Sequence, residues 1–145
     1  MADRFALNFP AEERAASRAM TETLQKLGVL GLPAHRAGDV QIALAEAVNN
    51  ILEHAYGGSR CGMVEIEARL TPACLTLILR DSGRALPGGT LPAAKLPDLT
   101  VDARDLPEGG FGWFLIAELT SHIHYQRRDG RNQLTLGFDI HDEGC

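Results

Sequence analysis

The sequence predicts an α+β fold, a two-layer α/β sandwich with helices on one face of a mostly antiparallel sheet. The expected order of elements is strand, helix, helix, strand, strand, long loop, helix, strand, strand. Strands that are joined by short turns pair antiparallel, which favours this architecture over a parallel sheet. A length of 145 residues suits one compact core and is short for two, so we expect residues 1–145 to form a single domain.

The first half of the chain predicts one strand and two helices. Phe5, Leu7 and Phe9 alternate with polar or small residues, as in a strand with one buried face. Helix formers with apolar residues three or four apart predict helices over 11–30 and 34–56. Each helix runs into glycines, which commonly end helices.

The second half predicts two hairpins and one more helix. The β-rich segments are 63–70 with 74–80, and 123–128 with 133–140. Asp129-Gly130 is a strong signal for a two-residue hairpin turn between the last two strands. A helix over 111–121 precedes this hairpin.

A Pro- and Gly-rich stretch over 84–108 separates the two hairpins. Loops longer than about 15 residues are uncommon inside compact domains and are usually functional or disordered. We interpret this stretch as a mobile lid over a ligand.

Composition and charge exclude several classes of protein. The net charge of −5 argues against nucleic-acid binding, and the one basic cluster, Arg127, Arg128 and Arg131, is expected to be a solvated hairpin tip. No apolar run approaches the roughly 18 residues that span a bilayer, and the N-terminus lacks the apolar core of a secretion signal. The three cysteines show no CxxC spacing, which favours a reducing cytoplasm without a disulfide framework or zinc site.

The helix over 34–56 carries a polar stripe. Glu46, Asn50 and His54 are spaced by four residues and therefore share one side, opposite an apolar face. This pattern alone is that of an ordinary amphipathic helix with a solvated face. The pair Asn49-Asn50 is unusual because asparagine is a poor residue inside a helix, and an amide oxygen could be a ligand for a hard cation.

Two glycine-containing segments could bind a nucleotide. Asp81-x-Gly83 follows an apolar strand, where the carboxylate could accept a hydrogen bond from an exocyclic amine and Gly83 would let a flat ring approach. Gly110-x-Gly112 precedes a helix, so its backbone N–H groups could cradle phosphate. Each segment has a simpler reading, as an Asx turn or as a glycine-rich loop tip without a ligand. The second segment is not a Walker A loop.

Taken together, these elements resemble the superfamily of gyrase, histidine-kinase and chaperone ATPases over nearly the full chain. The shared order is Glu46-x-x-x-Asn50, Asp81-x-Gly83, Gly110-x-Gly112 and Asn132 in the last hairpin. The helix Glu-Ala-Val-Asn-Asn-Ile-Leu-Glu-His-Ala-Tyr and the box Glu-Gly-Gly-Phe-Gly-Trp-Phe-Leu-Ile look most like anti-sigma-factor serine/threonine kinases.

The resemblance implies a Bergerat-type ATP-binding fold that uses ATP and Mg²⁺. It implies that Asn50 coordinates the Mg²⁺ bridging the phosphates, that Glu46 is the catalytic base and that Asp81 holds the adenine amine. Gly83, Gly110 and Gly112 would line the nucleotide pocket. The chain departs from the family at Ala85, where a second glycine is common, and at Trp113, where a smaller aliphatic residue is common.

The implied function is phosphorylation of a serine or threonine on a STAS-type anti-sigma-factor antagonist, alternating with capture of a sigma factor or similar regulator. The family also implies a homodimer, and the charge and hydropathy of the chain predict no direct contact with nucleic acid or membrane. The alternative is a non-catalytic module in which ATP only controls partner capture, although such a module would not need Glu46 as a base. Phosphorylation of histidine is disfavoured because no helical dimerisation segment precedes the domain.

Overall fold

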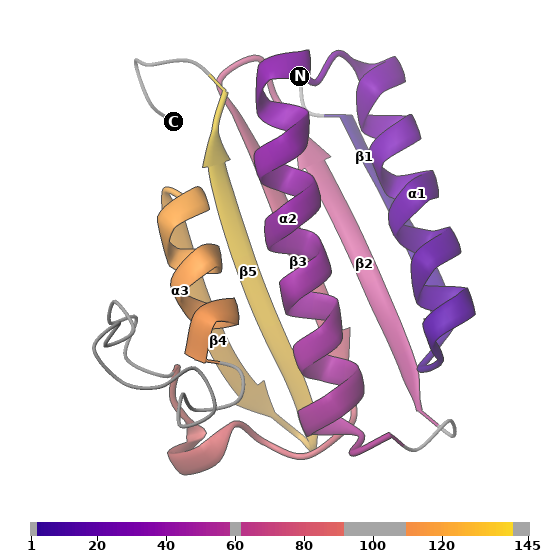
Figure 1. The fold of residues 1–145 in the computed structure, drawn as a ribbon, viewed down its shortest axis with the longest axis vertical. Coiled ribbons are helices and arrows are strands. Elements are labelled where there is room, and N and C mark those ends of the chain that lie inside the picture. The colour runs from indigo at the N-terminus through magenta and orange to yellow at the C-terminus, as the bar shows by residue number, and fades with distance from the viewer. Residues whose placement is uncertain (1–2, 59–61, 92–109, 141–145) are drawn as a thin grey trace, which may run out of the picture.

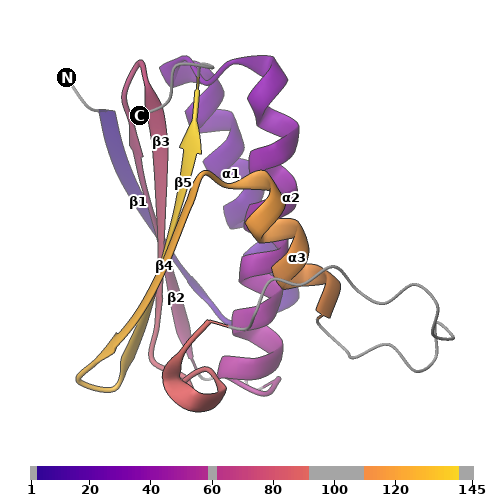
Figure 2. The same ribbon diagram turned by 90° about the vertical axis from the view of Figure 1, so that its left-hand side faces the viewer.

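The computed structural model describes residues 3–58, 62–91 and 110–140, and these residues form two layers. One layer is a five-stranded antiparallel sheet in the order β1-β2-β3-β5-β4. The other layer consists of the helices, which lie together on one side of the sheet (Figures 1 and 2). The predicted α+β architecture is therefore confirmed.

The elements follow the predicted order. The strands are β1 Asp3–Pro10, β2 Met63–Leu70, β3 Cys74–Asp81, β4 His122–Arg128 and β5 Arg131–Asp139. The helices are α1 Glu13–Leu30, α2 Ala34–Asn50 and α3 Gly110–Leu119, with short turns of other helix types at η1 Ile51–Ala55 and η2 Pro87–Gly89. Most of the lid predicted over 84–108 lies outside the described residues, and its described start contains η2.

The prediction of one regular helix over 34–56 was wrong at its C-terminal end. Residues Ile51–Ala55 form a π-helical turn, closed by a hydrogen bond of 3.0 Å from the backbone N–H of Tyr56 to the carbonyl of Ile51. A π-turn holds more residues than an α-turn, so side chains beyond Asn50 leave the stripe that begins at Glu46. His54 lies within this turn and is exposed, whereas Glu46 and Asn50 are half-buried.

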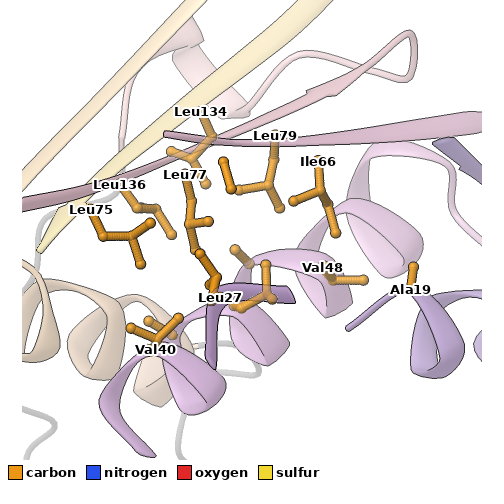
Figure 3. Close-up of a cluster of buried hydrophobic side chains, with 14 of the residues drawn as sticks. Ala19, Leu27, Val40, Val48, Ile66, Leu75, Leu77, Leu79, Leu134 and Leu136 are labelled. Atoms are coloured by element: carbon orange, nitrogen blue, oxygen red, sulfur yellow. The ribbon is translucent and has the colours of Figure 1, made fainter. Parts of the chain in front are cut away.

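The core lies between the sheet and α2 (Figure 3). Alternate residues of the three central strands point toward the helices, such as Ile66, Leu77 and Leu136, and they meet Val40 and Val48 of α2. Each of these side chains is fully buried. Burying one aliphatic side chain contributes about 1.5–3 kcal/mol, so this packing fixes α2 across the middle of the sheet.

The β4–β5 hairpin fixes the register next to the Asp81-x-Gly83 segment. Its turn has positive φ angles at Asp129 (53°) and Gly130 (76°), the backbone expected for an Asp-Gly hairpin turn. The register pairs Asp81 at the end of β3 with Asn132 at the start of β5, and Asn132 with Arg127 of β4. Residues that are distant in sequence thus meet at one end of the sheet.

The face of the sheet away from the helices is polar on β2 and β3. Arg80 forms ion pairs with Glu65 and with Glu67, the latter at 2.9 Å, and Glu67 also pairs with Arg69 at 2.6 Å. Of the helices in the described ranges, none is both long enough and apolar enough to cross a membrane.

Candidate functional site

Glu46 and Asn50 lie where α2 meets the first turn of α3. A Cβ atom built on Gly112 would lie 2.8 Å from Glu46 Oε2 and 3.9 Å from Asn50 Nδ2. A side chain at residue 112 would therefore have to displace the end of the Glu46 side chain, which Gly112 leaves undisturbed. The structure brings together Glu46, Asn50 and Gly112, and Gly110 begins the same helix.

The amide of Asn50 is left unsatisfied. Among the residues that the structure describes, its Nδ2 atom is buried and has no hydrogen-bond partner. A buried polar group without a partner costs about 1–3 kcal/mol, so such groups commonly mark a place where a ligand binds. A half-turn of the side chain exchanges the amide nitrogen and oxygen, and an amide oxygen beside a carboxylate suits Mg²⁺. The residues present therefore fit a magnesium-bound phosphate.

Asn49 faces a different part of the molecule from Asn50. It lines a cavity of about 930 Å³ between the end of α2 and the start of α1, together with Leu52, Glu53 and residues 11–14. The two adjacent asparagines thus have separate surroundings.

Asp81 is a buried carboxylate at the end of β3, with 4% of its surface exposed. Its Oδ1 atom accepts hydrogen bonds of 2.9 Å from the backbone N–H of Gly83 and from Nδ2 of Asn132. The hydrogen bonds that Asp81 accepts within the described ranges all go to Oδ1, which leaves Oδ2 as an acceptor for a ligand. Burial raises the pKa of Asp81 above its ordinary value, although these hydrogen bonds and the charges of Arg127 and Arg131 partly oppose the rise.

Gly83 allows a close contact with the protein itself. A Cβ on Gly83 would collide with the backbone carbonyl of Ala55 and lie 2.8 Å from Ala55 Cβ. The same carbonyl accepts a hydrogen bond of 2.7 Å from the N–H of Arg84. The Asp81-x-Gly83 turn is therefore held against the π-turn that follows Asn50. The Asp81-x-Gly83 segment and the Glu46–Asn50 pair thus both lie at the C-terminal part of the α2 region.

Comparison with protein families identifies the family of the chain. The family model described as "Histidine kinase-like ATPase domain" matches residues 9–138, which is nearly the whole chain and includes every candidate site residue. The chain belongs to the histidine kinase-like ATPase family. The expected superfamily is thereby confirmed, and the Glu46–Asn50–Gly112 and Asp81–Gly83 groups lie within the matched region.

Curated relatives of this histidine kinase-like ATPase domain include serine kinases. The chain is 35% identical over 92 residues to the serine/threonine-protein kinase BtrW of Bordetella bronchiseptica, an alignment that covers 63% of this chain and 62% of BtrW. It is 29% identical over 138 residues to the serine-protein kinase RsbW of Listeria monocytogenes serovar 1/2a, covering 90% of this chain and 83% of that protein. The chain thus spans somewhat less than two thirds of BtrW.

A solved structure supports the fold. The structure of the RsbU and RsbW domains of Rv1364c from Mycobacterium tuberculosis matches with a TM-score of 0.65 and 17% sequence identity. The match covers 94% of this chain and 32% of that one. The histidine kinase-like architecture is therefore shared over nearly all of the chain.

A hydrogen-bond network that the sequence did not reveal supports Asp81 from the β4–β5 hairpin. Asn132, buried with 5% exposure, donates to Asp81 and to the carbonyl of Arg84 at 2.8 Å. It accepts hydrogen bonds from the hydroxyl of Tyr125 at 2.6 Å and from Nη1 of Arg127 at 2.8 Å. Arg127 is exposed, as expected for the hairpin tip, but its guanidinium also takes part in this network.

Tyr56 ties the other side of the turn to the sheet. Its hydroxyl donates to the carbonyl of Met63 and accepts from the N–H of Ser82, both at 2.7 Å. Tyr56 comes directly after the π-turn, so this contact joins the end of the α2 region to β2 and to the segment after β3. No sequence signal distinguished Tyr56 from an ordinary aromatic core residue.

The two departures from the family pattern lie in different surroundings. Ala85 is exposed, two residues after Gly83. Trp113 is half-buried and packs against the hydrophobic core at the start of α3. The larger side chain at position 113 is therefore accommodated by packing in the helical layer.

Proposed function

We propose that this domain is an ATP-dependent serine/threonine kinase of a partner-switching system, which phosphorylates a STAS-type anti-sigma-factor antagonist and alternately captures a sigma factor. The observation that carries the proposal is the position of Glu46 and Asn50 directly under the start of α3, with Gly112 giving room for the contact. The relatives named as serine-protein kinases support the same chemistry. A homodimer belongs to this proposal as the family's usual assembly.

Each residue has a separate role in the proposed reaction. Asn50 would hold Mg²⁺, which when bound neutralises charge on the phosphates. Asp81 would accept a hydrogen bond from the adenine amine through Oδ2, and Gly83, Gly110 and Gly112 would shape the pocket. Glu46, one turn from Asn50, would orient the incoming serine or threonine hydroxyl and take its proton as the hydroxyl oxygen bonds to the γ-phosphorus and ADP leaves.

A pair of substitutions on α2 tests the kinase assignment. Glu46→Gln keeps the size of the side chain and removes the basic carboxylate, so ATP binding should stay within about twofold while antagonist phosphorylation slows by about 10²–10⁴-fold. Asn50→Ala should instead weaken Mg-ATP binding itself. The measurements are calorimetry with Mg-ATP and transfer of labelled phosphate to the antagonist encoded nearby in the genome.

The same helix provides matched controls. Glu53→Gln and Asn49→Ala make similar changes at exposed positions away from α3, and both variants should behave as the parent. If Glu46→Gln phosphorylates the antagonist at the parental rate, Glu46 is not the base. If the parent captures partners in an ATP-dependent way but never phosphorylates the antagonist, the domain is a non-catalytic capture module.

A further inference from the structure

The side-chain amide of Asn132 uses all of its hydrogen-bonding capacity. An asparagine amide has two N–H donors and an oxygen that accepts two hydrogen bonds. Nδ2 donates to Asp81 Oδ1 and to the carbonyl of Arg84, while Oδ1 accepts from Tyr125 and Arg127. If the amide turned over, its oxygen would face the carboxylate of Asp81, which is unfavourable.

Arg127 determines which way this amide points. A guanidinium group donates hydrogen bonds and accepts none, so the atom 2.8 Å from Arg127 Nη1 must be the amide oxygen. The Tyr125 hydroxyl requires the same orientation. It accepts a hydrogen bond from the N–H of Leu86 at 3.1 Å and donates its own proton to the amide oxygen of Asn132. The orientation of Asn132 is thus set from the hairpin side.

Arg127 also contacts the Asp81-x-Gly83 turn directly. Its Nη1 atom donates to the carbonyl of Gly83 at 2.8 Å, in addition to Asn132. Both Arg127 and the neighbouring Arg128 are exposed, but Arg128 lies on the other face of the hairpin, since side chains alternate along a strand. These two adjacent arginines carry the same charge but only Arg127 reaches the turn in the contacts among described residues.

We propose that Arg127 is a positioning residue for base recognition. It fixes the orientation of the Asn132 amide, so that Asp81 Oδ1 accepts hydrogen bonds from the protein and Asp81 Oδ2 remains available to the amino group of a purine. The inference rests on the proposed use of ATP and adds a specificity-determining residue to that site. Arg127 acts through Asn132 and the Gly83 carbonyl and need not touch the nucleotide.

The test compares two nucleotides that differ only in the amino group. ATP carries the 6-amino group, and purine riboside triphosphate lacks it. We expect the parent to bind ATP more tightly, and Arg127→Met to reduce this preference by about three- to tenfold while binding of purine riboside triphosphate changes little. Arg127→Lys keeps a donor-only cation and should recover part of the preference. Calorimetry of the full chain with Mg²⁺ measures the affinity of each protein for both nucleotides.

Arg128→Met is the matched control, because it removes the same charge one residue away. It should leave the preference for ATP unchanged. Tyr125→Phe removes the second donor to Asn132 and should act like Arg127→Met, which keeps the test decisive if one variant fails to fold.

Several results would overturn the proposal. If Arg127→Met weakened the binding of both nucleotides equally, Arg127 would only stabilise the turn. If Arg128→Met reduced the preference for ATP as much as Arg127→Met does, only net charge would matter. A parent that does not prefer ATP would contradict the assignment of Asp81 as well, and with it the inference. A parent that prefers ATP but does not phosphorylate the antagonist would contradict the kinase proposal alone.

Discussion

At the scale of single residues, Asp81 has two oxygens with different tasks. Oδ1 is committed to Gly83 and Asn132, and Oδ2 is the acceptor that the proposed adenine contact requires. Asp81→Asn can keep its carbonyl oxygen at the Oδ1 position and accept both of these hydrogen bonds. The amide nitrogen then replaces Oδ2, so a donor would face the adenine amine, which is also a donor.

This asymmetry predicts a specific loss of nucleotide binding. Asp81→Asn should weaken ATP binding by about ten- to a hundred-fold, the worth of a charge-assisted hydrogen bond, and leave the fold intact. Calorimetry gives the affinity and circular dichroism checks the fold. Asp129→Asn makes the same substitution in the exposed hairpin turn and should bind ATP like the parent. Unchanged affinity in well-folded Asp81→Asn would remove Asp81 from the site.

Residues of the site differed in how far sequence could place them. The placement of Glu46 and Asn50 on one side of α2 follows from their spacing along one helix, and the α-helix indeed continues through Asn50. The pairing of Asp81 with Asn132 depends on the register of strands that are 51 positions apart, which local patterns do not encode. Arg127 is exposed, as expected of a charge beside a turn, but its hydrogen bonds to Asn132 and to the Gly83 carbonyl depend on tertiary contacts that local sequence does not encode.

At the scale of elements, glycines decide how closely segments pack. Strand and helix periodicity predicted every strand and the three helices. The π-turn after Asn50 has no such signature, because its polar and apolar residues are ordered as at the end of an ordinary α-helix. The close approach of that turn to Gly83 likewise depends on tertiary packing. The sequence predicts that Gly83 lines the ligand pocket, which stays a prediction, and the structure adds that its missing side chain allows the contact with Ala55.

Two glycine-to-alanine substitutions should therefore have opposite effects. Gly83→Ala forces a Cβ into the Ala55 backbone and should reduce the free energy of unfolding by about 1–3 kcal/mol, as overpacking does. Gly28→Ala lies inside α1 with open space around the new Cβ, so it should raise that free energy by about 0.5–1 kcal/mol. Urea denaturation measures both. A neutral Gly83→Ala would show that the α2 end and the turn are not rigidly packed.

At the scale of the whole molecule, the two faces of the sheet hold carboxylates whose pKa values are shifted in opposite directions. On the helix side, burial raises the pKa of Asp81. On the outer face, burial alone would raise the pKa of Glu67, but hydrogen bonds and charges of Arg69 and Arg80 lower it overall. The alternation of inward and outward residues predicted from sequence separates these faces, but the ion partners of Glu67 depend on the β2–β3 register.

The two shifts predict opposite dependences of stability on pH. A raised pKa means that the folded state holds the proton of Asp81 more tightly than the unfolded chain does. The stability from this group is present below its ordinary pKa of about 4 and is lost as pH rises through the folded-state value. For Glu67 the lowered pKa contributes stability above about pH 4.3, which is lost as pH falls through the folded-state value.

Neutralising each carboxylate should therefore change stability in opposite directions at pH 7. Asp81→Asn should be at least as stable as the parent, and its advantage should shrink as pH falls below about 4, where the parent carboxyl is also neutral. Glu67→Gln should be less stable by about 1 kcal/mol or less, because its partners are partly exposed to solvent, and its deficit should vanish in acid. Urea denaturation of the parent and both variants between pH 3 and pH 7, roughly the range over which carboxyl groups titrate, measures the differences. A deficit of Asp81→Asn at pH 7 would show that the hairpin network stabilises the ionised carboxylate more than burial opposes it.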